Sequence, residues 1–311
     1  MQPKLSFGSW AFSFGPFESA PWSFERLCRY AAEAGYDGVE INGFRPHAYF
    51  RDFTGADDFR ELVALRDDLG LEYSGYAPDF HDVPPGVVDQ ATYLEAFEAA
   101  LRFCDRLGIS ILRVDTVSPP SDLPPAEYEE RFARLARTWN AAAELAAKSS
   151  VLLVWEFEPG FWLSRPSEVV RLLEAVAHPN FTVLFDTSHA YTSGVAGARQ
   201  GAHPELLAGG VTEYARLIEP YLGHLHLIDS DGSLHDEETS AHLPFGAGRV
   251  DFPSALRALQ PSLDTLPWWT VDFCFCPTTE RDARTAVPFV RSLMEQFAPT
   301  SAEGRGDSVA V

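Results

Sequence analysis

Short apolar runs and longer amphipathic stretches alternate along the whole chain. A short apolar run predicts a buried strand, and apolar residues three and four positions apart predict a helix. The expected strands are Leu5–Trp10, Gly38–Asn42, Leu71–Tyr76, Ser110–Asp115, Val151–Glu158, Phe181–Asp186, Gly223–Asp229 and Trp268–Phe273. The expected helices are Phe24–Ala34, Phe59–Leu69, Ala91–Leu107, Ala126–Lys148, Pro166–Val176, Glu205–Ile218, Phe252–Leu259 and Arg281–Phe297.

This order of elements predicts an α/β protein with a single domain, a (β/α)₈ TIM barrel over residues 1–298. A doubly wound sheet is the alternative architecture. Such a sheet usually carries a glycine-rich phosphate loop after an early strand, and the chain has no GxGxxG motif. Residues 299–311 have no apolar periodicity, and we expect them to form a disordered tail.

Four of the expected strands carry, at or near their ends, a side chain that can bind a metal. These residues are Glu156, Asp186, His226 and Asp272. Carboxylates and imidazoles are costly to bury unless they are paired or bind a metal. Each residue alone has an ordinary explanation as a turn, cap or core residue. In a barrel, however, the carboxyl ends of all strands meet on the face that holds the active site, so the coincidence predicts one shared metal site.

The donor set indicates which metals would bind. Three carboxylates and one imidazole favour Mn²⁺, with Mg²⁺ or Co²⁺ as alternatives. Zinc is less favoured because thiolates and a second histidine are missing from the set. Glu158 follows Glu156 by two positions, so both side chains point inward if either does. Either glutamate could therefore be the ligand from this strand.

These residues and a glycine-rich stretch give the chain a family resemblance. It resembles the sugar phosphate isomerase/epimerase superfamily, the xylose-isomerase-like barrels, over roughly residues 5–297. The segments that carry the resemblance are Val151–Pro159, Phe185–His189, Gly223–Asp229 and Gly246–Phe252. Asp272 stands where this family usually has glutamate. The shorter side chain implies that the metal shifts toward this strand or that the acid/base role of the residue changes.

The resemblance implies an enzyme that moves a proton on the carbon next to a carbonyl, with a metal acting as a Lewis acid. The metal ligands would be Glu156, Asp186, His226 and Asp272. Glu156 and Asp272 would also be catalytic, because a carboxylate near the metal can act as general acid or base. Glu158 and His189 would hold sugar hydroxyls.

Aromatic residues in the loops that follow the strands predict an apolar mouth over the site. Trp10 in the first of these loops is expected to contact the substrate. Arginines that could bind a phosphate group are few, and the nearby candidates are Arg45, Arg113, Arg165 and Arg249. Of these, Arg113 and Arg249 are expected to contact the substrate. A free sugar or an aryl glycoside is therefore favoured over a sugar phosphate.

Other functions for the same barrel are weighed against this one. A lyase resembling the α subunit of C-glycoside deglycosidases would use the same metal and base to cleave 3-keto C-glycosides by proton abstraction and elimination. A non-catalytic sugar-binding barrel would keep the carboxylates without turnover. A barrel nuclease of the abasic-site type is disfavoured because it needs more histidine ligands and a basic DNA-binding face.

Composition and charge limit which partners and which cellular compartment we expect. The formal net charge of −21 argues against nucleic acid and anionic membranes as partners. No apolar run approaches the roughly 20 residues of a membrane span. The N-terminus lacks a signal-peptide pattern, and the four cysteines form no zinc or disulfide pattern, so we expect a cytoplasmic protein. A homo-oligomer or a small β-subunit partner is a further expectation.

Overall fold

The computed structural model describes residues 2–120, 123–236 and 238–297. Eight parallel strands close into a barrel in the order β1-β10-β7-β6-β5-β4-β3-β2. The barrel strands are β1 (Lys4–Gly8), β2 (Gly38–Gly43), β3 (Glu72–Pro78), β4 (Ile111–Val114), β5 (Leu152–Glu156), β6 (Phe181–Asp186), β7 (Leu222–Leu227) and β10 (Trp268–Val271). The predicted single-domain TIM barrel is confirmed. The tail expected at residues 299–311 lies outside the described residues.

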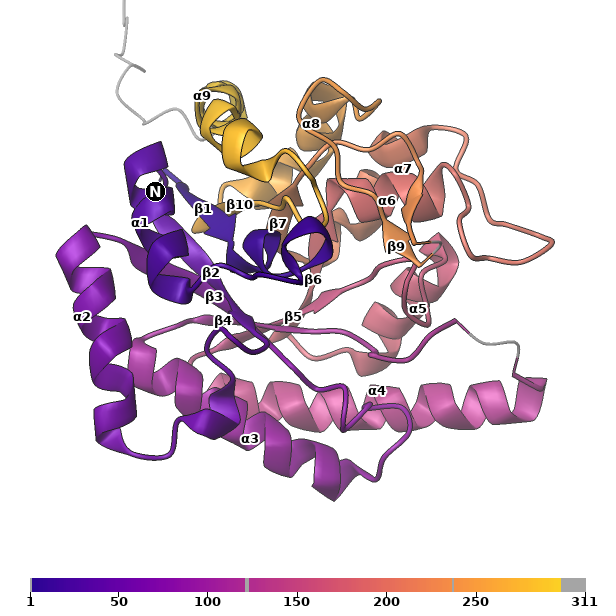
Figure 1. Cartoon of the computed structure of the whole chain (residues 1–311). Helices are drawn as coiled ribbons and strands as arrows, with labels where there is room; N and C mark the ends of the chain where they lie inside the picture. Colours follow the sequence, from indigo (N-terminus) through magenta and orange to yellow (C-terminus); the bar gives the residue numbers. More distant parts are fainter. Residues whose placement is uncertain (1, 121–122, 237, 298–311) are drawn as a thin grey trace, which may run out of the picture.

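Helices surround the barrel (Figure 1). They are α1 (Phe24–Ala34), α2 (Arg60–Leu69), α3 (Gln90–Leu107), α4 (Pro125–Lys148), α5 (Pro166–Val176), α6 (Thr187–Gly194), α7 (Gly210–Ile218), α8 (Phe252–Leu263) and α9 (Thr279–Phe297). The helix expected from Glu205 begins only at Gly210. The preceding segment is bonded elsewhere, because the Leu207 N–H donates to the carbonyl of Gly194 at 2.9 Å.

Two elements near the site were not predicted from the sequence. Helix α6 is short and largely polar, so its apolar periodicity is weak, and it begins where Asp186 caps its first turn. In the connection from β7 to β10, β8 (Leu234–His235) pairs with β9 (Thr239–Ser240) in an antiparallel ribbon. Residues of this connection reach the cavity at the end of the barrel.

The barrel interior changes from apolar to polar along the strands. Side chains two positions apart share a strand face, so Val154 and Glu156 lie on one face of β5, and Leu184 and Asp186 on one face of β6. Val154 and Leu184 belong to a small apolar cluster that is separate from the main core. The buried carboxylates Glu156 and Asp186 follow them toward the carboxyl ends of the strands. This order places a polar site above an apolar floor.

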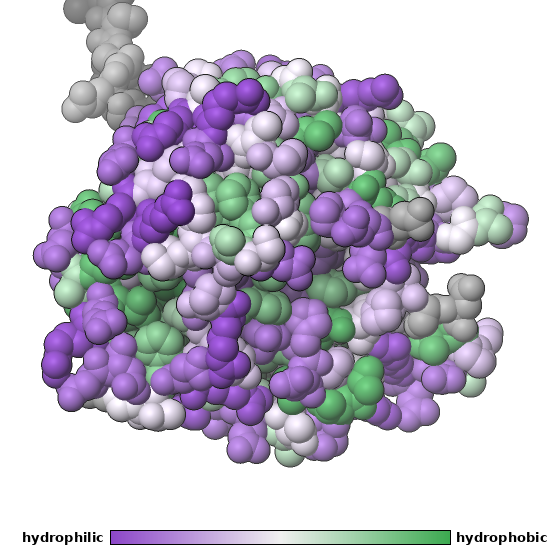
Figure 2. Space-filling view, in the orientation of Figure 1, coloured by the Kyte–Doolittle hydropathy of each residue, from purple (hydrophilic) through white to green (hydrophobic). Residues whose placement is uncertain are grey.

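The main apolar core lies between the barrel strands and the surrounding helices. Figure 2 shows hydrophilic residues over most of the visible face, with hydrophobic residues gathered in smaller separate patches. Among the described residues, no helix combines the length and apolar character needed to cross a membrane.

Candidate metal centre and active site

The four residues predicted to bind a metal lie together at the carboxyl end of the barrel. Glu156 and Asp186 are the last residues of β5 and β6, His226 lies near the end of β7, and Asp272 directly follows β10. One ligand atom from each residue lies within 4.8 Å of those from the other three. All four side chains are buried, and the most exposed, Asp272, keeps 3% of its surface accessible.

Three members of this cluster each keep a buried polar atom that accepts or donates no hydrogen bond among the described residues. These atoms are Glu156 Oε1, Asp186 Oδ2 and His226 Nδ1. Asp186 Oδ1, in contrast, accepts hydrogen bonds from the N–H groups of Ser188 at 2.7 Å and His189 at 2.8 Å. Leaving buried polar atoms unpaired costs free energy. A divalent cation between them would satisfy all three, so the donor set fits a metal.

Asp272 is anchored through one of its two oxygens. Oδ1 accepts hydrogen bonds from Trp10 Nε1 at 2.6 Å, from the Cys274 N–H at 2.7 Å and from His242 Nδ1 at 3.1 Å. Oδ2 lies 3.7 Å from His226 Nδ1. The shorter side chain therefore reaches the cluster with one oxygen held by the protein and the other facing the candidate ligands.

The cluster gathers more negative than positive charge. Burial raises the pKa of Asp186 to about 7, and the charges on Asp272 and Glu156 add to this effect. Burial also raises the pKa of Glu156, but the opposite charges of Arg113 and His226 outweigh it and hold the pKa at about 2. Carboxylates crowded in this way repel one another, and a divalent cation would offset the repulsion.

Glu158 and His189, predicted to bind substrate, line the same cavity. Glu158 Oε2 accepts a hydrogen bond from the Thr239 hydroxyl and lies 3.8 Å from His189 Nε2. Burial, and then the charge of Glu156, raise the pKa of Glu158 to about 7. Burial lowers the pKa of His189 to about 3, so this ring is neutral, and its Nδ1 bonds to Ser240 Oγ at 2.9 Å.

Arg113 and Trp10 also line the cavity. The Arg113 guanidinium pairs with Glu156 and, at 3.3 Å, with Asp115. Because the guanidinium already pairs with these two carboxylates, it is less available to bind a phosphate group. The Trp10 ring centroid lies 5.3 Å from that of His226. Trp10 therefore packs against one candidate ligand and donates to another.

Arg249 is not brought to the site. The residue is exposed and does not line the cavity. Its backbone N–H donates to the Ser230 carbonyl at 2.8 Å. The surrounding loop is tied to Asp229, which accepts hydrogen bonds from the N–H groups of Gly246 and Gly248 at 2.9 Å each. The glycine-rich stretch thus wraps a buried carboxylate and does not direct an arginine toward the cavity.

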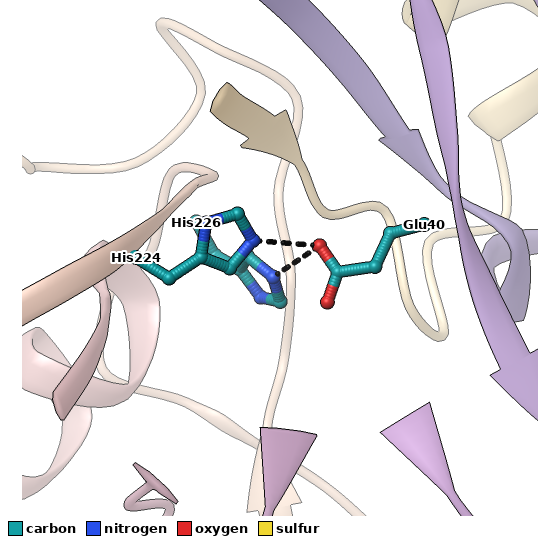
Figure 3. Close-up of side chains that lie close together, drawn as sticks. All are labelled: Glu40, His224 and His226. Atoms are coloured by element: carbon teal, nitrogen blue, oxygen red, sulfur yellow. Dashed lines mark hydrogen bonds and ion pairs between the residues drawn. The ribbon is translucent and has the colours of Figure 1, made fainter. Parts of the chain in front are cut away.

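Three buried residues near the site, Glu40, His224 and His242, were not among the site residues expected from the sequence. Glu40 on β2 contacts His224 and His226, and the two histidines point toward its carboxylate (Figure 3). His242 lines the cavity; burial lowers its pKa, but Asp272 has the larger combined effect and raises it to about 9. The alternation of His224 and His226 on one strand face was the available signal. No sequence pattern links Glu40 or His242 to their partners.

The cavity above the cluster has a volume of about 270 Å³. Its lining includes the aromatic residues Trp10, Phe14, Phe44, Phe161 and Phe275. Among the described lining residues, Arg113 is the single arginine or lysine. The walls are therefore aromatic and acidic, in agreement with the aromatic mouth expected from the sequence.

The chain is similar in sequence and in fold to several known proteins. Fructoselysine 3-epimerase of Escherichia coli O157:H7 is 24% identical over 247 residues, which cover 75% of this chain and 79% of that protein. Inosose dehydratase of Erwinia tasmaniensis is 24% identical over 290 residues, or 87% of each protein. A crystal structure of D-psicose 3-epimerase in the presence of D-fructose has the same fold, with a TM-score of 0.70 and 18% identity over 94% of this chain and 99% of that chain.

The family itself is established by a match over most of the barrel. The model of the family described as Xylose isomerase-like TIM barrel matches residues 28–264. This segment includes Glu156, Asp186 and His226, and it ends just before the strand that precedes Asp272. The chain therefore belongs to the xylose isomerase-like TIM barrel family of sugar isomerases and epimerases.

Proposed function

We propose that this protein is a divalent-metal-dependent sugar epimerase or isomerase. It would move a proton on the carbon next to a carbonyl of an uncharged sugar or glycoside. The main support for this proposal is the convergence of Glu156 Oε1, Asp186 Oδ2 and His226 Nδ1, buried atoms that make no hydrogen bond among the described residues, beside a small cavity that Glu156 lines. The names of the relatives, an epimerase and a dehydratase, support chemistry of this kind.

The proposed metal site consists of the four clustered residues. Glu156, Asp186, His226 and Asp272 would hold the cation. Mn²⁺ is the expected metal because oxygen donors predominate in the set. A bound cation would supply Lewis acidity that stabilises negative charge developing on the substrate oxygens.

The proton would be moved by the protein's own carboxylates. Glu156 and Asp272 come from strands that are separated by β6 and β7 in the barrel, so they face the cluster from different sides. One group, as the carboxylate, would take the proton from carbon, and the other, as the carboxylic acid, would give its proton to the opposite face, which inverts the configuration without net oxidation. Glu158, with a pKa of about 7, is suited to exchange a proton with a sugar hydroxyl at neutral pH.

The cavity favours an uncharged substrate. Its carboxylates outnumber Arg113, the single lysine or arginine among the described lining residues, and Arg113 is already paired with Glu156 and Asp115. A sugar phosphate would bring further negative charge into this acidic site. Aromatic side chains at the mouth are suited to pack against a sugar ring or an aryl group.

Proton exchange tests this function most directly. Ketohexoses would be incubated with the Mn²⁺-loaded protein in D₂O, and deuterium on the carbon next to the carbonyl would be followed by NMR. We expect exchange and a new epimer or isomer with the wild type, and exchange reduced at least about 100-fold in Glu156→Gln, the usual scale for loss of an acid/base group. Binding of sugars without any exchange would instead support a non-catalytic sugar-binding barrel.

Elimination is the second candidate reaction, favoured by the similarity to inosose dehydratase across 87% of the chain. The same proton abstraction would be followed by loss of a group from the next carbon, forming a carbon–carbon double bond conjugated with the carbonyl. The leaving group would be water in a dehydratase, or the aglycone in a 3-keto C-glycoside lyase. Mass spectrometry separates the two reactions, because epimerisation conserves the substrate mass and elimination splits off the leaving group.

A further inference from the structure

We propose that Glu40 is a positioning residue of the metal centre. It would set the orientation of the His226 ring and keep hydrogen on Nε2. As a result, Nδ1 would be the atom that faces the metal. The inference rests on the proposed metal-dependent function. Glu40 lies on β2 and is not one of the four clustered residues; it forms a separate group of ligand-capable side chains with His224 and His226. In that group Glu40 Oε2 is already hydrogen-bonded to both histidines, so its role would be to act through His226.

One oxygen of Glu40 accepts hydrogen bonds from three polar groups. Oε2 lies 2.8 Å from His224 Nε2, 3.1 Å from His226 Nε2 and 2.9 Å from the Thr270 hydroxyl, and the carboxylate is fully buried. Figure 3 shows both imidazole rings directed at this oxygen from neighbouring positions on β7. An ionised carboxylate only accepts hydrogen bonds. The His226 Nε2 atom must therefore carry hydrogen to make this contact.

The contact determines what the opposite side of the ring can do. A histidine that binds a metal is neutral and carries hydrogen on one nitrogen only, so hydrogen on Nε2 would leave the Nδ1 lone pair for the metal. His226 Nδ1 lies 3.0 Å from Glu156 Oε1, inside the metal cluster, and makes no hydrogen bond among the described residues. Carboxylates that hold the second nitrogen of a metal-binding histidine orient the ring and strengthen it as a ligand.

Packing holds Glu40 itself in place. Gly75 on β3 faces the side chain, and a Cβ atom at that position would lie 3.2 Å from Glu40 Cδ. His224 and Thr270 approach from the other side with their polar atoms. The carboxylate is thus confined between the adjacent strand β3 and side chains that reach it across the barrel from β7 and β10, as required of a group that sets the orientation of another side chain.

The test compares Glu40→Gln with the wild type in metal binding. The amide has the same size and can accept a hydrogen bond, but it lacks the charge that strengthens His226 as a ligand. We expect the affinity for Mn²⁺ and Zn²⁺, measured by competition with a chromophoric chelator, to fall about 10- to 100-fold. In the Zn²⁺-loaded wild type, ¹⁵N NMR of the histidine rings should show hydrogen on His226 Nε2 and zinc on Nδ1.

Ser74→Ala is the matched control. Ser74 is a buried polar residue on β3 that bonds to Ser6, outside the metal cluster, so its loss should lower the melting temperature without lowering metal affinity. His224→Phe provides a second test if Glu40→Gln does not fold. It keeps an aromatic ring and the Glu40 charge but removes the Nε2 donor that helps to hold the carboxylate, and a smaller, several-fold loss of affinity is expected.

The possible failures are distinguishable. A wild-type protein that binds neither metal overturns the proposed function and the role of Glu40 together. If the wild type binds metal and Glu40→Gln binds it equally well, the positioning role alone is overturned. Zinc found on His226 Nε2 would also overturn it, because that nitrogen could not then donate to Glu40.

Discussion

At the scale of single residues, the distinctive feature is how Asp272 is held. The side chain is one methylene shorter than the glutamate expected there from the family resemblance. Trp10, His242 and the backbone of Cys274 all donate to Oδ1, which leaves Oδ2 toward the cluster. Hydrogen bonds to a charged group are stronger than those between neutral groups. We infer that these donors set the direction of Asp272.

Trp10→Phe tests this arrangement. The substitution keeps an aromatic ring beside His226 but removes the donor 2.6 Å from Asp272 Oδ1. We expect the affinity for Mn²⁺ to fall by about tenfold, since losing a hydrogen bond to a charged group costs about 1.5–3 kcal/mol. Isothermal titration of the metal-free protein measures the change.

Trp139→Phe is the control for loss of a buried indole. Trp139 packs against Trp155 and Phe181 and is absent from the cavity lining. Its replacement should reduce the free energy of unfolding and leave metal affinity unchanged. Equal metal affinities in Trp10→Phe and the wild type would show that Asp272 needs no support from Trp10.

At the scale of elements, the period of two along each strand explains why the four-residue cluster could be predicted. An apolar run that ends in a carboxylate places that carboxylate at the rim of the barrel, as in β5 and β6. Helix α6 and the β8–β9 ribbon lack such a period, so they were missed. Arg249 was expected near the substrate as one of the few available arginines, but Asp229 accepts hydrogen bonds from N–H groups of the glycine-rich loop that carries it and holds this loop in place.

Asp229→Asn tests the anchoring of that loop. Asp229 accepts hydrogen bonds from the backbone of Ser230, Gly246, Gly248 and Val250, and an asparagine would place an NH₂ group against some of these donors. We expect the free energy of unfolding to fall by about 3 kcal/mol, the scale of losing one or two charged hydrogen bonds in a buried site.

Urea unfolding measures this change, and Asp231→Asn is its neighbour control. Asp231 is exposed and bonds only to Ser233 among the described residues, so its replacement should cost less than about 1 kcal/mol. Similar losses in the two variants would mean that the buried position of Asp229 confers no special stability on the loop.

At the scale of the whole molecule, the contacts that could not be predicted are those made by closure of the barrel. Glu40 and His226 are 186 positions apart in the chain and meet only because β2 and β7 enclose the same interior. His242 likewise reaches Asp272 through a long connection whose path has no periodic signal. Strand faces can be read from local pattern, whereas partners across the barrel depend on the closed geometry.

Global stability should depend on pH through His47. Burial lowers the pKa of this histidine below its ordinary value, although the Trp22 carbonyl accepts its hydrogen bond at 3.0 Å and opposes the shift. Because the unfolded chain then binds a proton more readily than the folded protein, stability is full above the unfolded pKa of about 6.5 and falls as the pH drops below it.

His47→Gln separates this effect from those of other titrating groups. Urea unfolding at pH 7.5 and pH 5.5 should show a smaller loss of stability on acidification in the variant than in the wild type. The glutamine can still donate to the Trp22 carbonyl, so the variant is expected to fold. Identical losses in both proteins would exclude His47 as a source of the pH dependence.

We propose that the four clustered residues form one divalent metal site. The first experiment is plasma mass spectrometry of protein purified without chelators, before and after dialysis against Mn²⁺. We expect about one divalent cation per chain in the wild type and a large loss of metal in Asp186→Asn, which removes the charge of a ligand whose Oδ2 has no other partner among the described residues. A wild type that contains no metal and takes up none on dialysis would show that the four residues do not form a metal site.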